Sequence, residues 1–243
     1  YGVLVGVDFP LTSNVNLGAF LGYSDFNQRF SSLEARTEGN NTVFGGYLDV
    51  TGSGFKIGAI IAYGDGDGET HRSLASINAD TTASYDMNTL TLHGEFGYNL
   101  LLNEKYNLTP HAKLTYISSD RGQATENGAN GANLIVAAEK TEFLVSDIGA
   151  DFKGNISEGV SAGLTIGWRY NLKNDPISAT ARFSDEINDF TVLEAMSGRS
   201  RFIAGAGLFT NISSNWILHT RYNGEFGSKY SNHSVWVGMK IEM

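Results

Sequence analysis

This sequence of 243 residues contains no cysteine, only three prolines and no long apolar run. The lack of cysteine excludes both a disulfide framework and a thiolate metal site. A formal net charge of −9 leaves no basic excess to neutralise phosphates, which argues against nucleic-acid binding. No stretch approaches the roughly 20 apolar residues that a membrane-spanning helix needs. Disulfide-rich domains, nucleic-acid-binding proteins and helical membrane proteins are therefore excluded.

The sequence does contain a period-two alternation of apolar and polar residues, repeated along its whole length. Along residues 55–63 the odd positions are Phe, Ile, Ala, Ile and Tyr, whereas the even positions include Lys56 and Gly58. The mean hydropathy of −0.17 hides this pattern, because the two kinds of residue cancel in the average. Helical spacing does not recur. The pattern predicts an all-β chain with about eleven strands of the ~10-residue length that a tilted barrel strand needs.

The segments between these strands alternate between tight turns and long polar stretches. Tight turns are predicted at 52–54, 103–104, 155–159 and 213–215, and long loops at about 31–40, 64–86, 119–142 and 172–200. Within the last of these, residues 177–183 are a candidate for extending a strand above the membrane. Outer-membrane barrels have short periplasmic turns and longer loops at the outer rim. The connections therefore favour a transmembrane antiparallel up-and-down β-barrel.

Aromatic residues on the apolar face gather near both ends of the strands. Eight residues separate Phe55 from Tyr63, which is about 26 Å along a strand. With a tilt of ~40° this distance gives a band of roughly 20 Å, close to the height of a lipid-facing belt. Two aromatic girdles are predicted. They comprise Phe9, Phe55, Tyr98, Phe152 and Trp216 beside the tight turns, and Tyr23, Tyr63, Tyr116, Tyr170 and Tyr222 beside the long loops.

The opposite face carries charged side chains in nearly every run. Each unpaired buried charge costs several kcal/mol, so this face cannot form the dry core of a soluble sandwich. A soluble monomer would not expose the apolar, aromatic-rimmed face all the way round. We therefore predict lipid outside and an aqueous pore inside. The predicted pore-lining residues are Asp8, Asp49, Lys56, His93, Glu95, His111, Lys113, Asp147, Asp151, Lys153, Arg169, His219, Arg221, Glu225, Lys240 and Glu242.

Two features of the charged face each allow two interpretations. Its glycines, such as Gly18, Gly58 and Gly163, either clear room for a threaded helix or chain or relieve strain in a tightly curved sheet. Its mixed charges either form a weakly adhesive wall along which polypeptide slides, or bridge adjacent strands and stiffen the wall. For most of the charges the second interpretation is favoured.

Several segments of the sequence, taken in order, resemble the C-terminal translocator (β-domain) of bacterial autotransporters. They are Gly-Val-Asp at 6–8, LGAFLGY at 17–23, FGGYLDV at 44–50, GEFGYNL at 94–100, LTPHAKLTY at 108–116 and VWVGMKIEM at 235–243. The resemblance covers essentially the whole chain. It implies a twelve-stranded outer-membrane barrel with a helix in its lumen. One departure is the last residue, Met243, because these barrels usually end in an aromatic.

The parity of the strands leads to a further expectation. The final run ends on the tight-turn side, whereas the first begins on the long-loop side. Single-chain bacterial barrels have an even number of strands and both termini in the periplasm. We therefore expect residues 1–243 to be a single translocator domain with about eleven of twelve strands, lacking its first strand and its lumen helix.

The resemblance implies that the chain anchors an autotransporter in the outer membrane and supports export of its N-terminal passenger by type V secretion. The C-terminus would be periplasmic and the long loops extracellular. The implied partners are outer-membrane lipid, the passenger with the lumen helix, and the barrel-assembly machinery. No lipid-facing polar cluster suggests an oligomer, so a monomer is expected.

Two other functions remain open, a diffusion porin or small-solute channel and an adhesin that acts through external loops. The sequence shows no nucleophile motif and no metal-ligand spacing. No enzyme activity, catalytic residue, metal or cofactor is therefore assigned.

Overall fold

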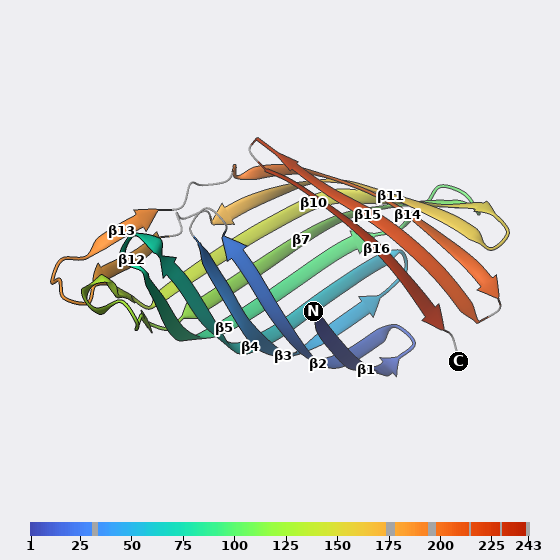
Figure 1. Cartoon of the computed structure of the whole chain (residues 1–243). Coiled ribbons are helices and arrows are strands. Elements are labelled where there is room, and N and C mark those ends of the chain that lie inside the picture. Colours follow the sequence, from blue (N-terminus) through green and yellow to red (C-terminus); the bar gives the residue numbers. More distant parts are fainter. Residues whose placement is uncertain (31–33, 174–177, 194–197, 214, 229, 242–243) are drawn as a thin grey trace.

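The computed structural model describes residues 1–30, 34–173, 178–193, 198–213, 215–228 and 230–241. Its main sheet is an antiparallel meander in which each long strand pairs with the next one along the chain (Figure 1). The long strands are β1 (Gly2–Thr12), β2 (Val15–Phe30), β3 (Ala35–Thr51), β4 (Phe55–Leu74), β5 (Ala79–Tyr98), β7 (Tyr106–Arg121), β10 (Glu139–Ser157), β11 (Val160–Lys173), β14 (Ser200–Ser213), β15 (Trp216–Gly227) and β16 (Tyr230–Ile241). A short strand, β6 (Leu100–Leu101), pairs with β7. The prediction of an up-and-down β-sheet protein with about eleven strands is confirmed.

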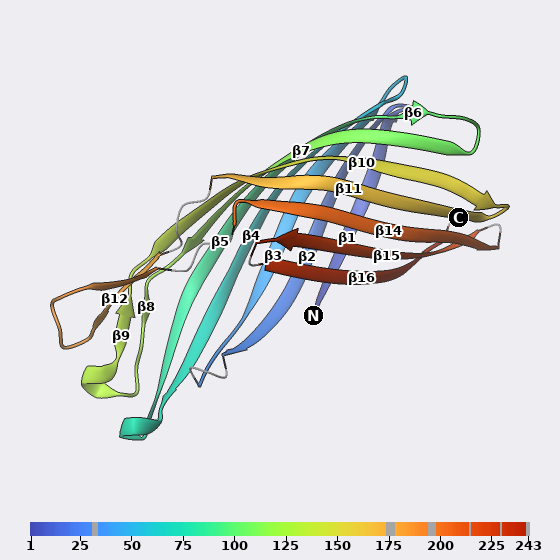
Figure 2. The same ribbon diagram turned by 90° about the horizontal axis from the view of Figure 1, so that it is seen from above.

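The main sheet curls into a half-barrel with β1 and β16 as its two edges (Figures 1 and 2). Every second connection is a tight turn, such as the one between Thr12 and Val15, and these turns gather at one end of the sheet, which we call the turn end. The other connections gather at the opposite end, which we call the loop end, and they include the two longest, between β7 and β10 and between β11 and β14. Among the described residues, no helix is both long enough and apolar enough to cross a membrane.

Two of the predicted long loops, 31–40 and 64–86, are wrong for most of their described residues, which belong to strands. Strands β2 and β3 stay paired as far as Phe30 and Ala35, and β4 and β5 as far as Leu74 and Ala79. Only the 3₁₀ turn η1 (Ala75–Ile77) and the adjoining residues interrupt the region 64–86. Hydrophobic alternation reveals a strand only where one face is apolar. Beyond Tyr63 both faces are polar or small, so the pattern fades while the backbone ladder continues.

The other two predicted loops, 119–142 and 172–200, contain a second sheet. Its strands are β8 (Ala124–Thr125), β9 (Leu134–Val136), β12 (Ser178–Phe183) and β13 (Phe190–Leu193), in the order β13-β12-β9-β8. We call it the accessory sheet, and it lies at the loop end (Figure 1). Residue 177 is outside the described residues. Strand β12 pairs with β9 and β13 and does not extend β11, so the predicted extension is wrong.

Glycines allow a close approach between β3 and β4 at the loop end. A Cβ on Gly66 would lie 2.2 Å from the backbone oxygen of Asn40, whereas a Cβ on Gly94 would meet nothing within 4 Å. Overpacking of this kind costs about 1–3 kcal/mol.

We expect Gly66→Ala to push β3 and β4 apart and to speed protease cleavage within residues 64–86 of the membrane-inserted protein. Gly94→Ala, the matched control in β5, should leave the cleavage rate unchanged. Equal cleavage rates in the two variants would show that the strands do not approach as closely as described.

Candidate functional site: the charged concave face

The charged face of the main sheet is the inner face of the curl. A cavity of about 260 Å³ is lined by Lys56 on β4 and by Arg221 on β15, together with residues of the intervening strands. Strands six positions apart in one sheet can border a common cavity only on its concave side. Cross-strand register then assigns the neighbouring residues to this face or to the convex one.

The residues predicted to line the pore fall on this concave face wherever the structure describes them. By register they include Asp8, Asp49, Lys56, His93, Glu95, His111, Lys113, Asp147, Asp151, Lys153, Arg169, His219, Arg221 and Glu225. Lys240 has a concave-face register position, opposite Ile217. Glu242 lies outside the described residues.

One hydrogen-bonded row across the sheet collects much of this charge. It runs from Asp49 on β3 to Arg201 on β14 by way of Gly58, Glu95, Lys113, Asp147 and Arg169. At the β3 side of the row, Lys56 Nζ lies 2.9 Å from Glu95 Oε1 and 3.9 Å from Asp49 Oδ1. Lys113 Nζ lies 3.7 Å from Glu95 Oε2. Four consecutive strands are thus joined by one chain of ion pairs.

Arg169 is the centre of a second network. Its Nε and Nη2 donate to the two carboxylate oxygens of Asp147 at 2.7 and 2.8 Å. Its Nη1 donates to Glu225 Oε1 at 2.5 Å, and Arg201 Nη1 lies 3.6 Å from Glu225 Oε2. One guanidinium on β11 therefore connects β10 with β15, across the intervening strand β14.

Hydroxyl and imidazole groups complete the polar wall. Thr165 Oγ1 donates to Asp151 Oδ1 at 2.5 Å, and His111 Nδ1 lies 3.2 Å from Asp151 Oδ2. His93 Nδ1 and Thr115 Oγ1 are 2.8 Å apart. These contacts agree with the favoured interpretation of the charges as bridges between strands.

Sequence reasoning missed Arg201, which falls between the predicted loop 172–200 and the run that follows it, because apolar Ile203 and Phe209 share its face and blur the alternation. The alternation does place Thr115 and Thr165 on the charged face, but the predicted pore lining names only charged residues and histidines and so leaves these hydroxyl groups out.

The ten predicted girdle residues lie on the convex face. A single hydrogen-bonded row connects Phe9, at the turn end of β1, with Tyr170, at the loop end of β11. The row takes seven steps between strands. At about 4.8 Å a step and a tilt of ~40°, it climbs roughly 22 Å. That height matches the belt expected from Phe55 and Tyr63, so both girdles are consistent with one strand tilt.

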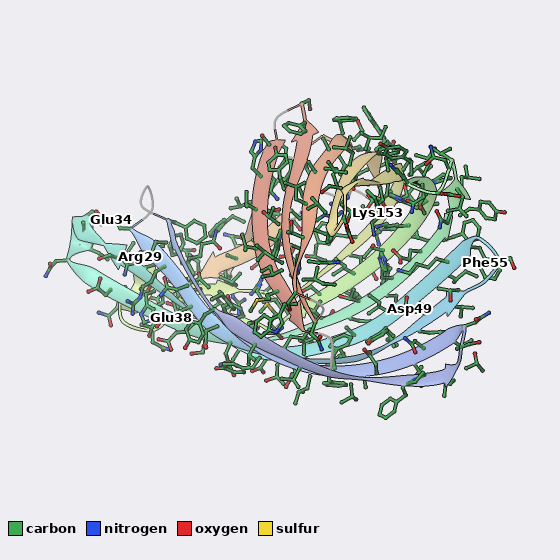
Figure 3. The ribbon with its side chains drawn as sticks, turned by 90° about the vertical axis from the view of Figure 1, so that its right-hand side faces the viewer. Arg29, Glu34, Glu38, Asp49, Phe55 and Lys153 are labelled. Atoms are coloured by element: carbon green, nitrogen blue, oxygen red, sulfur yellow. The ribbon has the colours of Figure 1, made fainter. Side chains whose placement is uncertain are left out.

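The apolar surface of the convex face ends at the tyrosines of the loop end. On β4, Tyr63 is followed on the same face by Asp65, Asp67 and Glu69. The Tyr63 hydroxyl donates to Asn88 Oδ1 at 2.9 Å. Figure 3 shows Arg29, Glu34 and Glu38 at this end of the molecule and Phe55 at the other. Strands β2–β5 therefore change from an apolar to a polar convex face at the predicted girdle.

The accessory sheet is held to the β4–β5 hairpin by a buried ion pair. Arg72 Nε donates to Glu126 Oε1 at 2.9 Å, Arg72 Nη2 pairs with Glu126 Oε2, and the same Nη2 donates to the Ala132 carbonyl at 3.2 Å. The backbone N–H of Leu134 donates to Glu126 Oε2 at 2.8 Å. The Glu126 side chain is only 8% exposed. This carboxylate therefore ties the accessory sheet to the hairpin, next to the backbone bridge between Thr82 and Asn127.

The ion pair between Arg72 and Glu126 should be sensitive to acid. Burial disfavours the charged form of Glu126, but hydrogen bonds from Arg72 and Leu134 outweigh burial and hold its pKa below the ordinary value of 4.5. A carboxyl group with a lowered pKa stabilises the fold above its ordinary pKa, and this contribution is lost as the pH falls through the lowered value.

We therefore expect amide-exchange protection at Leu134, corrected for intrinsic rates, to be constant at neutral pH and to fall as the pH drops below 4.5. In Arg72→Met protection should be low throughout and its dependence on pH much flatter. Undiminished protection of the unmodified protein at pH values well below 4.5 would contradict this account.

Comparison with known proteins identifies the family. The family model described as "Autotransporter beta-domain" matches residues 1–223. The translocator domain of the autotransporter NalP from Neisseria meningitidis is similar in fold, with a TM-score of 0.78 and 18% identity over 100% of this chain and 79% of that one. The β-domain of the Bordetella autotransporter BrkA is also similar in fold, with a TM-score of 0.70 and 16% identity over 100% of this chain and 90% of that one.

The chain belongs to the autotransporter β-domain family, and it has the fold of an outer-membrane translocator barrel. It is also 26% identical over 250 residues to an extracellular serine protease of Serratia marcescens. That match covers 98% of this chain but only 23% of the protease. The protease activity in that name is stated for the whole relative, of which this chain spans less than a quarter.

Proposed function

We propose that this chain anchors an autotransporter in the outer membrane and supports export of its N-terminal passenger through the space enclosed by the concave face. The observation that carries the proposal is the pairing of charge on that face in a member of this family. Paired charges make a wall that is hydrophilic but only weakly adhesive, which suits the passage of varied polypeptide.

The predicted pore-lining charges whose side chains the structure describes, taken together with Arg201, balance. The cations are Lys56, Lys113, Lys153, Arg169, Arg201 and Arg221, and the anions are Asp8, Asp49, Glu95, Asp147, Asp151 and Glu225. Nearer the loop end, the register also places Arg72, Arg121 and Glu139 on this face. The excess acid of the chain, which has a net charge of −9, therefore lies elsewhere. A nearly neutral wall would neither trap nor repel a segment of one sign along its whole length.

The same proposal includes an orientation and a set of partners. The turn end would face the periplasm and the loop end, with the accessory sheet, the outside of the cell. The convex belt would contact lipid, while the passenger and a lumen helix would occupy the interior. Insertion would depend on the barrel-assembly machinery, and the barrel would act as a monomer. Glu95 lies between Lys56 and Lys113, and we assign it a structural role and no catalytic one.

The direct test is export by the full-length protein. With residues 1–243 intact, an epitope in the passenger should become accessible to antibody on intact cells. Deletion of these residues should leave the passenger in the periplasm while its expression is unchanged. Surface display without these residues would contradict the proposal. Steady conductance of the intact protein in planar bilayers, without any dependence of passenger export on the barrel, would support the alternative of a diffusion channel.

A further inference from the structure

Two cations on the concave face lack the acidic partners that the others have. Across the described ranges, neither Lys153 nor Arg221 forms an ion pair with a carboxylate. Lys153 Nζ lies 5.7 Å from the centre of the Phe209 ring. Arg221 donates from Nε to Asn223 Oδ1 at 3.0 Å and from Nη2 to Thr165 Oγ1 at 3.5 Å. Both side chains are exposed on the inner surface, so each can still accept an anionic partner.

The two cations flank a floor made of glycine. One hydrogen-bonded row runs from Lys153 on β10 through Gly163 and Gly207 to Arg221 on β15. The strands between the cations thus contribute no side chain at this level. A Cβ on Gly163 would meet its nearest atom at 3.7 Å, an ordinary van der Waals contact, and both glycines line the cavity described above. Phe209 forms one wall of this space, and Figure 3 marks the position of Lys153.

The cavity at this place is positively charged. The side chains around its 260 Å³ include four cations, Lys56, Lys113, Lys153 and Arg221, but only two carboxylates, Glu95 and Asp151. Glu95 is shared between two lysines, and Asp151 is engaged by Thr165 and His111. A local excess of two positive charges in a chain of net charge −9 is the opposite of what composition alone would produce.

We propose that this cavity, which we call the glycine-floored cup, is a binding site for the carboxylate side chains of polypeptide inside the lumen. The proposal rests on the proposed function, because that function supplies polypeptide as the occupant. A carboxylate seated on the floor would accept hydrogen bonds from Lys153 and Arg221, while Phe209 packs against its methylene groups. Acidic segments would therefore dwell at this level of the wall, and neutral or basic segments would not.

The test uses the protein in planar bilayers with synthetic peptides as the probe. A peptide of glutamate residues should block the current at a concentration about tenfold lower than a glutamine peptide of equal length, since two exposed ion pairs of ordinary strength give that ratio. The double variant Lys153→Gln, Arg221→Gln should lose the preference. The exchange Lys153→Arg, Arg221→Lys should keep most of it.

Two further variants separate the cup from general electrostatics. Arg29→Gln with Arg36→Gln removes the same charge from the convex face at the loop end, and should leave the preference unchanged. Gly163→Leu fills the cup without altering any charge and should weaken block by the glutamate peptide. Two results would show that the cup is not a site for polypeptide carboxylates. One is that the glutamate peptide blocks Gly163→Leu as strongly as it blocks the unmodified protein. The other is that inorganic phosphate blocks the current as well as the glutamate peptide does.

The same measurements distinguish an incorrect carboxylate site from an incorrect proposed function. Equal block by glutamate, glutamine and lysine peptides in a conducting protein that still exports its passenger would overturn the cup alone. A membrane-inserted protein that neither conducts nor exports would contradict the proposed function, and the cup with it.

Discussion

Replacement of Ile61 by arginine is expected to lower the free energy of unfolding from bilayers by about 2 kcal/mol. Ile61 lies on the convex face, is 57% exposed and sits two residues inside the girdle at Tyr63. A charged side chain on the lipid face costs about 2–4 kcal/mol at the midplane and less near the interface. Urea titration of the protein folded into vesicles measures the change.

Ile60 provides a matched control, because it is the same residue type one position earlier. The register places it on the concave face, opposite Tyr47 and His93, where an arginine would reach water. Ile60→Arg should therefore change the free energy of unfolding by less than about 1 kcal/mol. A larger loss from Ile60→Arg than from Ile61→Arg would mean that the two faces have been assigned the wrong way round.

Replacement of Arg169 by methionine is the second change with a large expected effect. It removes the bidentate contact with Asp147 and the bond to Glu225, leaving two carboxylates without their main partner. Breaking a buried pair costs about 3–5 kcal/mol. The Arg169 side chain is 29% exposed, so screening by lumen water should reduce the loss to about 2 kcal/mol. The measurement is the same urea titration.

Two companion variants define what that result means. Lys153→Met removes a cation with no carboxylate partner and should cost less than about 0.5 kcal/mol. Arg169→Lys keeps the charge but cannot form the two-point contact with Asp147. Its free energy of unfolding should therefore lie between those of Arg169→Met and the unmodified protein. A loss for Arg169→Met no greater than that for Lys153→Met would show that the network does not tie β10 to β15.

The sequence was sufficient for the part of the fold in which the two faces of a strand differ chemically. Between Phe55 and Tyr63 the alternation identified the strand and its two faces. Charged residues such as Glu95 and Arg169 were placed on the concave face for the same reason, since they lie an even number of residues from others on that face. Their contacts, by contrast, depend on cross-strand register, which a single strand's pattern does not specify.

Prediction failed where both faces of a strand are polar. Residues 64–69 of β4 continue the ladder with alternating glycine and acid, a composition that also describes a loop. The accessory sheet was missed because its strands are two to six residues long, too short for a period to show. The glycine-floored cup also required the structure, because it depends on Gly163 and Gly207 meeting across β11 and β14.

The central claim, lipid on one face and water on the other, can be measured most directly on β4. The chain has no cysteine, so a single introduced cysteine carries one spin label. Labels at Ile57, Ala59 and Ile61 should be relaxed more strongly by oxygen, which concentrates in lipid. Labels at Lys56, Gly58, Ile60 and Ala62 should be relaxed more strongly by a water-soluble paramagnetic complex. An absence of alternation, or alternation of opposite phase, would contradict a barrel with its charged face inside.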